Sequence, residues 1–251
     1  MRIIDINATL GYVPGRTEPP DTVEGLLRQM DTTGVESAVA FYNRSIVQIM
    51  PGNQDIQEIA DNSNGRIKAC WLLHPYMDGV QLPEPKELLQ LLREKRPAAV
   101  RLMPLQGRYL LNDFYCDELL EILRILRIPV LINYRSDMDN PLEILPKITE
   151  EYPEIPFVLT DAYHKSSVLV RTMLRKRQNV YIPVSYMCGA GELDQLVNSF
   201  GPDRFLFGSS DGNMQGGAMG LVYQGRFSPE AKEAIFSGNW VRLQEGIQWE
   251  S

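Results

Sequence analysis

The chain has 251 residues, of which 44% are hydrophobic and 23% are charged. This is the composition of an ordinary globular protein, and it excludes a mainly disordered chain, a collagen and a coiled coil. Lys and Arg total 25 against 32 Asp and Glu, so the formal net charge is -7. Because such a surface repels phosphate backbones and anionic lipid, we expect no nucleic-acid and no membrane partner.

Three cysteines, Cys70, Cys116 and Cys188, stand far apart in the sequence and form no CxxC pair. This usage favours a reduced compartment over a disulfide framework. The first residues read as a strand and not as a signal peptide. We therefore expect a cytoplasmic protein.

Short apolar runs alternate with amphipathic stretches along the whole chain. Strands are predicted at residues 3–8, 37–42, 67–73, 98–103, 130–134, 157–160, 180–185 and 205–208. Helices are predicted at residues 22–33, 54–60, 85–95, 116–126, 142–152, 166–177, 192–200 and 229–236. The second helix is the weakest, because Asn62, Ser63 and Asn64 dilute its pattern.

Each predicted strand is followed by a predicted helix, and no linker or repeat divides the chain. Eight βα units in about 250 residues predict one α/β domain over residues 1–251, a (β/α)8 TIM barrel. A doubly wound open sheet is the alternative. That fold favours a glycine-rich turn after the first strand, which residues 7–11 do not supply.

Polar side chains occur at the predicted carboxyl ends of the strands, where a barrel builds its active site. In the first strand Asp5, Asn7 and Thr9 alternate with apolar residues, so they are expected to share one face. His74 follows the third strand. Arg101 lies among apolar residues of the fourth, and its guanidinium needs a carboxylate from the protein or from a ligand.

The later strands add amide, phenol, acid and imidazole groups. The side chains that we expect at the mouth are Asn133, Arg135, Asp161, His164, Tyr186 and Asp211. Asp5 and Asp161 are the expected protein partners of Arg101. Because both histidines and three aspartates fall at strand ends, we expect a functional site there.

Several segments carry a family resemblance, most specifically residues 203–211 and 237–243, with residues 4–9, 130–133 and 179–182 in support. In these segments the chain resembles the amidohydrolase-2 group of the amidohydrolase superfamily. These are TIM-barrel hydrolases and decarboxylases related to aminocarboxymuconate-semialdehyde decarboxylase. The resemblance covers nearly the whole chain.

The resemblance implies a divalent metal held by an Asp-x-His-x-His motif, by histidines of strands five and six and by an aspartate of strand eight. The corresponding positions hold Asn7, Thr9, Asn133 and Asp161, and Ser210 takes the register of the aspartate unless a bulge brings in Asp211. Amide and hydroxyl oxygens bind zinc more weakly than imidazole does, so this pattern indicates a degenerate metal site. A non-standard site for Zn, Mn or Mg remains open, with Asp5, His74, His164 and Asp211 as ligands.

Two functions follow as hypotheses. In the first, the chain is a hydrolase or C–C lyase that acts on a small carboxylate-bearing molecule. Asp211, Asp161 and His164 are then catalytic, and Arg101, Asn133, Arg135 and Tyr186 bind the substrate. In the second, the chain is a metal-free, non-catalytic relative that binds a small anionic ligand, and a homo-oligomer is compatible with both.

Two other ideas concern single features of the sequence. Cys188 precedes a predicted helix and would be a nucleophile if His164 activated it. The loop of residues 212–220 is rich in glycine, so it would bind phosphate or serve as a lid that carries Met214 and Met219.

Overall fold

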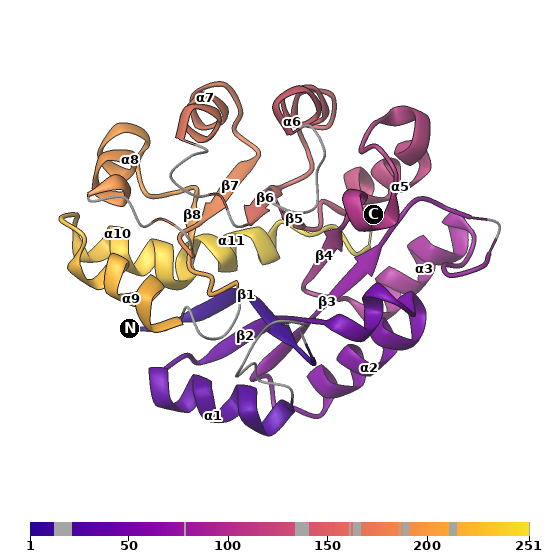
Figure 1. Cartoon of the computed structure of the whole chain (residues 1–251), viewed down its shortest axis with the longest axis horizontal. Coiled ribbons are helices and arrows are strands. Elements are labelled where there is room, and N and C mark those ends of the chain that lie inside the picture. The colour runs from indigo at the N-terminus through magenta and orange to yellow at the C-terminus, as the bar shows by residue number, and fades with distance from the viewer. Residues whose placement is uncertain are drawn as a thin grey trace.

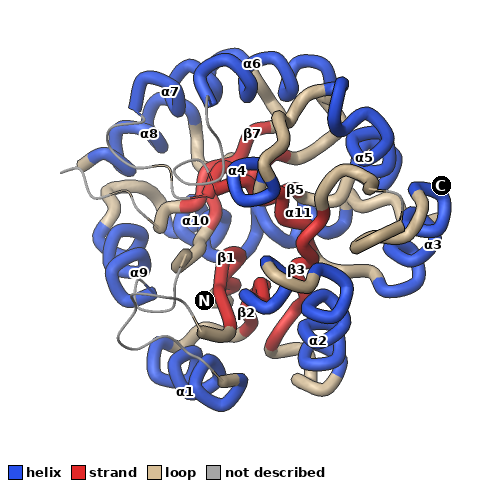
Figure 2. Tube along the Cα trace, turned by 45° about the vertical axis from the view of Figure 1, so that its right-hand side comes forward, coloured by secondary structure: helices blue, strands red, loops and turns tan. Residues whose placement is uncertain are grey.

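The computed structural model describes residues 1–12, 22–77, 79–133, 141–160, 162, 167–185, 187, 191–210 and 215–250, with the backbone alone at 141–143. Eight parallel strands form one sheet in the order β1 to β8. The helices surround this nearly closed barrel on the outside, as Figures 1 and 2 show. The predicted (β/α)8 TIM barrel is therefore confirmed.

The strands agree closely with the predicted apolar runs. They are β1 (Ile4–Leu10), β2 (Ser37–Tyr42), β3 (Ile67–Leu73), β4 (Ala99–Leu102), β5 (Val130–Asn133), β6 (Phe157–Thr160), β7 (Val180–Pro183) and β8 (Phe205–Leu206). Nearly all of their side chains are buried. This burial fits the parallel arrangement, in which helices cover the outer face of the sheet.

The helices include every predicted one. They are α1 (Val23–Thr33), η1 (Asn43–Ile46), α2 (Ile49–Asp61), α3 (Pro85–Lys95), α4 (Pro104–Gly107), α5 (Asp113–Leu126), α6 (Pro141–Glu151), α7 (Ser167–Lys176), α8 (Glu192–Phe200), α9 (Gln215–Gln224), α10 (Pro229–Glu233), η4 (Ala234–Gly238) and α11 (Asn239–Glu245). Among the described residues no helix is long and apolar enough to cross a membrane.

Helix α9 lies where the sequence suggested a glycine-rich loop. The residues buried on this helix are Gln215, Ala218, Met219 and Val222, which recur at helical spacing. The expectation that 212–220 form a loop is therefore wrong from Gln215 onward, and Met219 packs in the core instead of covering a pocket. Residues 211–214 lie outside the described part of the chain.

The barrel closes between its first and last strands. The backbone N–H of Ile6 in β1 donates to the carbonyl of Phe207, just after β8, at 3.0 Å. Short polar side chains bind the backbone where strands end. Asn53 of α2, for example, bonds to both the N–H and the C=O of Leu72, at 2.9 and 2.8 Å. These contacts fix the strand ends that form the mouth.

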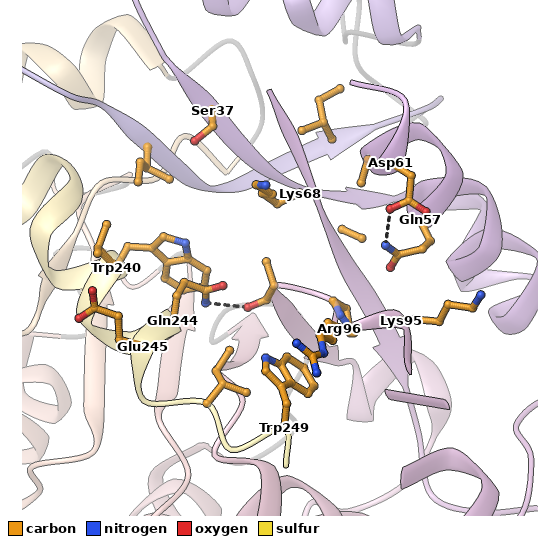
Figure 3. Close-up of a pocket in the computed structure, with 18 of the residues that line it drawn as sticks. Ser37, Gln57, Asp61, Lys68, Lys95, Arg96, Trp240, Gln244, Glu245 and Trp249 are labelled. Carbon is orange, nitrogen blue, oxygen red and sulfur yellow. Dashed lines mark hydrogen bonds between the residues drawn. The ribbon is translucent and has the colours of Figure 1, made fainter. Parts of the chain in front are cut away.

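The opposite end of the barrel is covered by the C-terminal segment. Gln244 of α11 donates to the carbonyl of Ala98 at 2.9 Å, and the backbone N–H of Gln248 donates to Leu126 at 2.8 Å. A cavity of about 540 Å³ lies here, between α11 and the first residues of the strands (Figure 3). Two cations that line it, Arg2 and Arg96, pair with glutamates. Because catalysis in such barrels takes place at the carboxyl ends of the strands, this cavity is not the candidate site.

Candidate functional site

A β-bulge in β1 decides which of its polar side chains face the barrel interior. Asp5 pairs with Ala38 and Thr9 with Phe41, so four steps along β1 match three steps along β2. Because side chains alternate along a strand, this shift puts Asp5 and Thr9 on opposite faces of the sheet. The expectation that Asp5, Asn7 and Thr9 share a face is therefore wrong.

Register places Thr9 and Arg101 on the interior face. Thr9 pairs with Phe41, Phe41 with Cys70, and Cys70 with Ala99, two residues before Arg101. The guanidinium of Arg101 lies 5.2 Å from the centre of the Phe41 ring, which confirms this shared face. Such stacking of a cation on an aromatic ring stabilises a desolvated guanidinium by about 2 kcal/mol.

The guanidinium of Arg101 is a buried charge on this face. Its side chain is 6% exposed, and Nη2 donates to Oδ1 of Asn7. Its Nε has no hydrogen-bond partner among the described residues, and it forms no ion pair with a described carboxylate. A buried cation without a counter-ion is costly, so Arg101 calls for a carboxylate of the protein or of a ligand, as its apolar neighbours in the sequence predict.

Cys70 adjoins the same guanidinium but does not neutralise it. Burial raises the pKa of the Cys70 thiol to about 11, although the charge of Arg101 acts in the opposite direction. The thiol is therefore protonated at neutral pH. It fills space beside Arg101 without acting as its counter-ion.

Asp5 belongs to a separate hydrogen-bond cluster, between the barrel wall and the helices. Its Oδ1 accepts from the backbone N–H groups of Asn7 at 3.1 Å and of Ser209 at 2.9 Å. Its Oδ2 accepts from the hydroxyl of Ser209 and from Nε2 of Gln215 at 2.9 Å. Gln215 in turn accepts from Thr33 of α1 at 2.9 Å. Asp5 thus connects β1 to the end of β8, to α9 and, through Gln215, to α1.

Two opposing effects act on the ionisation of Asp5. The side chain is fully buried, and this desolvation raises the pKa of its carboxyl above 3.8. The hydrogen bonds from Ser209, Gln215 and Asn7 favour the carboxylate and lower the pKa, but they do not outweigh the burial. Each carboxylate oxygen of Asp5 already accepts two hydrogen bonds, and Asp5 does not pair with Arg101. The expectation that Asp5 is the counter-ion of Arg101 is therefore wrong.

A further bond joins β1 to the end of β8 at the mouth. The hydroxyl of Thr9 donates to the backbone carbonyl of Ser210 at 3.0 Å. Ser210 has a positive φ of 62°, a conformation that is uncommon for residues other than glycine. The chain therefore turns sharply just before residues 211–214.

His74 lies beside a cleft of about 610 Å³ at the carboxyl ends of β3 and β4. It follows Leu72 by two residues, and Leu72 pairs with Arg101 across the sheet. One ring nitrogen, Nδ1, hydrogen-bonds to the Pro75 carbonyl, and Nε2 is buried without a partner among the described residues. Helix α4, which borders the cleft, begins at Pro104, two residues after β4 ends at Leu102.

Aromatic and sulfur-containing side chains form a large part of the lining of the cleft. They are Tyr76, Met77, Met103, Tyr109, Phe114 and Tyr115, with Arg108 as the cation. An aromatic lining with few charged groups is typical of sites for planar organic molecules. The cleft therefore suits a planar ring.

The remaining predicted site residues are placed only in part. Asn133 ends β5, is half-buried and pairs in register with Thr160. Asp161, His164, Asp211, Arg135 and Tyr186 lie outside the described residues, as does Cys188. Their predicted roles, and the ligand set that includes His164 and Asp211, stay predictions.

The described residues of strand one do not fit a divalent metal. The side-chain oxygen of Asn7 accepts from the guanidinium of Arg101. The carboxylate of Asp5 lies on the outer face of the sheet, where it already accepts four hydrogen bonds. In the described ranges no three His, Cys, Asp or Glu side chains come together in a way that suits an ion. The donor set that is present at β1 is therefore that of a hydrogen-bonded cluster.

Sequence reasoning missed several side chains that complete these clusters. Phe41 and Cys70 surround Arg101, and Ser209 and Gln215 bind Asp5. The strand register would have brought Phe41 to the same face as Arg101, had the pairing been known. No sequence signal marked Gln215, because it begins a helix that was expected to be a loop.

Comparison with known families gives one match. The sequence model described as amidohydrolase matches residues 11–243, which is most of the chain. A search of curated proteins gave no match.

The fold is similar to that of several solved structures. An uncharacterized TIM-barrel protein from Bordetella bronchiseptica is 19% identical, with a TM-score of 0.77 and coverage of 98% of this chain and 99% of that one. The 4-oxalomesaconate hydratase of Rhodopseudomonas palustris is 16% identical, with a TM-score of 0.69 and coverage of 97% and 96%. A dihydroxybenzoic acid decarboxylase from Polaromonas sp. JS666, with bound manganese and the inhibitor 2-nitroresorcinol, is 16% identical, with a TM-score of 0.71 and 97% coverage of both chains. At such identities the likeness shows the fold alone.

Proposed function

The chain belongs to the amidohydrolase family of enzymes, and we propose that it is a lyase or hydrolase that acts on a small aromatic carboxylate at the mouth of the barrel. The observation that carries this proposal is the guanidinium of Arg101, which is buried, stacked on Phe41 and without a described counter-ion. A carboxylate of the substrate would supply that counter-ion through charge-assisted hydrogen bonds.

The cleft beside His74 supports the aromatic part of the proposal. Its lining of Tyr, Phe and Met side chains favours a planar ring. Leu72, which also lines the cleft, pairs in register with Arg101, and this supports a site in which the ring and its acidic group bind side by side. Structural neighbours include a hydratase of 4-oxalomesaconate and decarboxylases of dihydroxybenzoates, whose names describe substrates with carboxyl groups.

The catalytic roles are assigned by sequence. Arg101, with Asn133, Arg135 and Tyr186, would bind and orient the substrate. Asp161, His164 and Asp211 would exchange protons with it. Arg101 would also stabilise negative charge that develops on the substrate, because a fixed guanidinium in a desolvated site needs no reorganisation during the reaction.

One pair of ligands tests the charge recognition. We expect the purified protein to bind 2,6-dihydroxybenzoate at least tenfold more tightly than 2,6-dihydroxybenzamide, because the amide keeps the ring and loses the negative charge. Isothermal titration calorimetry measures both affinities under the same conditions. Equal affinities would contradict the proposed carboxylate recognition.

The alternative function is a relative that binds a small anion without converting it. The same geometry of Arg101 favours it, since that geometry explains binding without any catalytic step. Incubation of the protein with 2,6-dihydroxybenzoate, followed by chromatography, separates the two functions. Loss of the acid with formation of resorcinol supports the enzyme, whereas binding without turnover of this and related ring acids supports the alternative.

A further inference from the structure

We infer that the guanidinium of Arg101 takes the place of a metal ion at strand one, so that the fixed positive charge of the mouth belongs to the protein itself. The inference rests on the proposed function in one respect, because the ligand that this charge recognises is the substrate carboxylate. It adds that this recognition is independent of divalent metal.

The first observation is the bond between Arg101 and Asn7. Asn7 stands where the resemblance places a metal-binding histidine, and Oδ1 is the atom of an asparagine side chain that can bind an ion. Here that oxygen accepts from Nη2 of Arg101. A divalent ion would have to displace the guanidinium and would be repelled by it in a site of low dielectric.

The second observation is how Thr9 and the end of β8 are joined. The resemblance places a metal ligand at residue 9 and another in the register of Ser210, so an ion would bridge these two strands. In this chain the Thr9 hydroxyl donates directly to the Ser210 carbonyl at 3.0 Å. The hydrogen bond from Ile6 to Phe207 and the cluster around Asp5 add further direct links between the same strands.

The third observation is the unused donor of Arg101. Its Nε is buried and has no partner among the described residues, although Nη2 is bound to Asn7. A guanidinium that is held at Nη2 and has an unsatisfied N–H group at Nε offers donors to both oxygens of a carboxylate. The ligand class is therefore a carboxylate that binds to the protein directly and not through an ion.

Metal content tests the inference without reference to activity. We expect the wild-type protein to carry far less than one metal ion per chain after growth with added manganese and zinc, as measured by inductively coupled plasma mass spectrometry. The double variant Asn7→His/Thr9→His should gain little metal, because Arg101 still occupies the site. The triple variant Asn7→His/Thr9→His/Arg101→Met should gain close to one ion per chain, because imidazoles replace the oxygens and the competing charge is gone.

Three results would overturn the inference. They are near-stoichiometric metal in the wild-type protein, equal metal binding by the double and triple variants, and a folded triple variant that binds no ion. Thermal unfolding checks that each variant folds. Should the triple variant not fold, the wild-type metal content decides by itself.

A chelator separates this inference from the proposed function. If EDTA leaves the affinity for 2,6-dihydroxybenzoate unchanged, both stand. If EDTA abolishes binding, the carboxylate function survives and the replacement of the ion is wrong. If the protein as purified carries no metal and binds no carboxylate, with or without EDTA, the replacement of the ion stands and the proposed function is wrong.

Discussion

Replacement of Arg101 with Met is expected to weaken the binding of 2,6-dihydroxybenzoate about 30- to 150-fold. Methionine keeps much of the volume of the side chain and removes the charge. The loss corresponds to about 2–3 kcal/mol, the upper part of the range for a hydrogen bond to a charged group. Isothermal titration calorimetry of wild type and variant measures the change directly.

Two further variants show whether the loss comes from this guanidinium. Arg124→Met makes the same exchange on the exposed face of α5, where Arg124 pairs with Glu121, and should leave the affinity unchanged. Arg101→Lys keeps the charge without the planar fork, so we expect an affinity between those of wild type and Arg101→Met. An Arg101→Met protein that folds and binds as tightly as wild type would exclude Arg101 from the site.

Replacement of Asp5 with Ala is expected to lower the free energy of unfolding by about 3–5 kcal/mol, because it leaves four buried donors without an acceptor. The donors are two backbone N–H groups, the hydroxyl of Ser209 and the amide of Gln215. Urea denaturation followed by circular dichroism measures the loss. Asp31→Ala removes an exposed carboxylate that pairs with Arg66, and it should cost less than about 1 kcal/mol.

The pH dependence of Asp5 has a definite sign. Because burial raises the pKa of its carboxyl above 3.8, the folded state binds the proton more tightly than the unfolded state does. Its contribution to stability is therefore complete below pH 3.8 and is lost as the pH rises through the raised pKa. The Asp5→Asn protein lacks this titration, so the unfolding free energy of wild type relative to Asp5→Asn should decrease from pH 4 to pH 7. A difference that increases with pH would mean that the hydrogen bonds outweigh the burial.

The barrel was predictable because strand and helix signals in this chain are local. Apolar runs of four to seven residues are bounded by turns, and amphipathic stretches follow them, so eight units were visible without any tertiary information. The cap of α1 is an example. Thr22 accepts from the N–H of Gly25 at the start of the helix, and Gly34 ends it with a φ of 77°.

The site was less predictable because it depends on register between strands. A single bulge in β1 turns Asp5 away from the interior, although Asp5, Asn7 and Thr9 occupy alternate positions in the sequence. Such a shift depends on how β1 pairs with β2, and the sequence of β1 alone does not specify this pairing. The assignment of Arg101 to a buried position needed only its apolar neighbours, and it was correct.

The prediction for the segment of helix α9 was wrong for a related reason. Its glycines indicate a loop when they are read locally, whereas the buried positions Gln215, Ala218 and Val222 form a helical stripe against the core. Tertiary packing outweighs the low helix propensity of glycine here.

A crystal structure of the protein with 2,6-dihydroxybenzoate tests the central claim most directly. The account predicts that the carboxylate of the ligand lies within hydrogen-bond distance of Nε of Arg101, with the ring towards the cleft beside His74. A carboxylate bound to a metal ion, or a ligand seated away from Arg101, would contradict it.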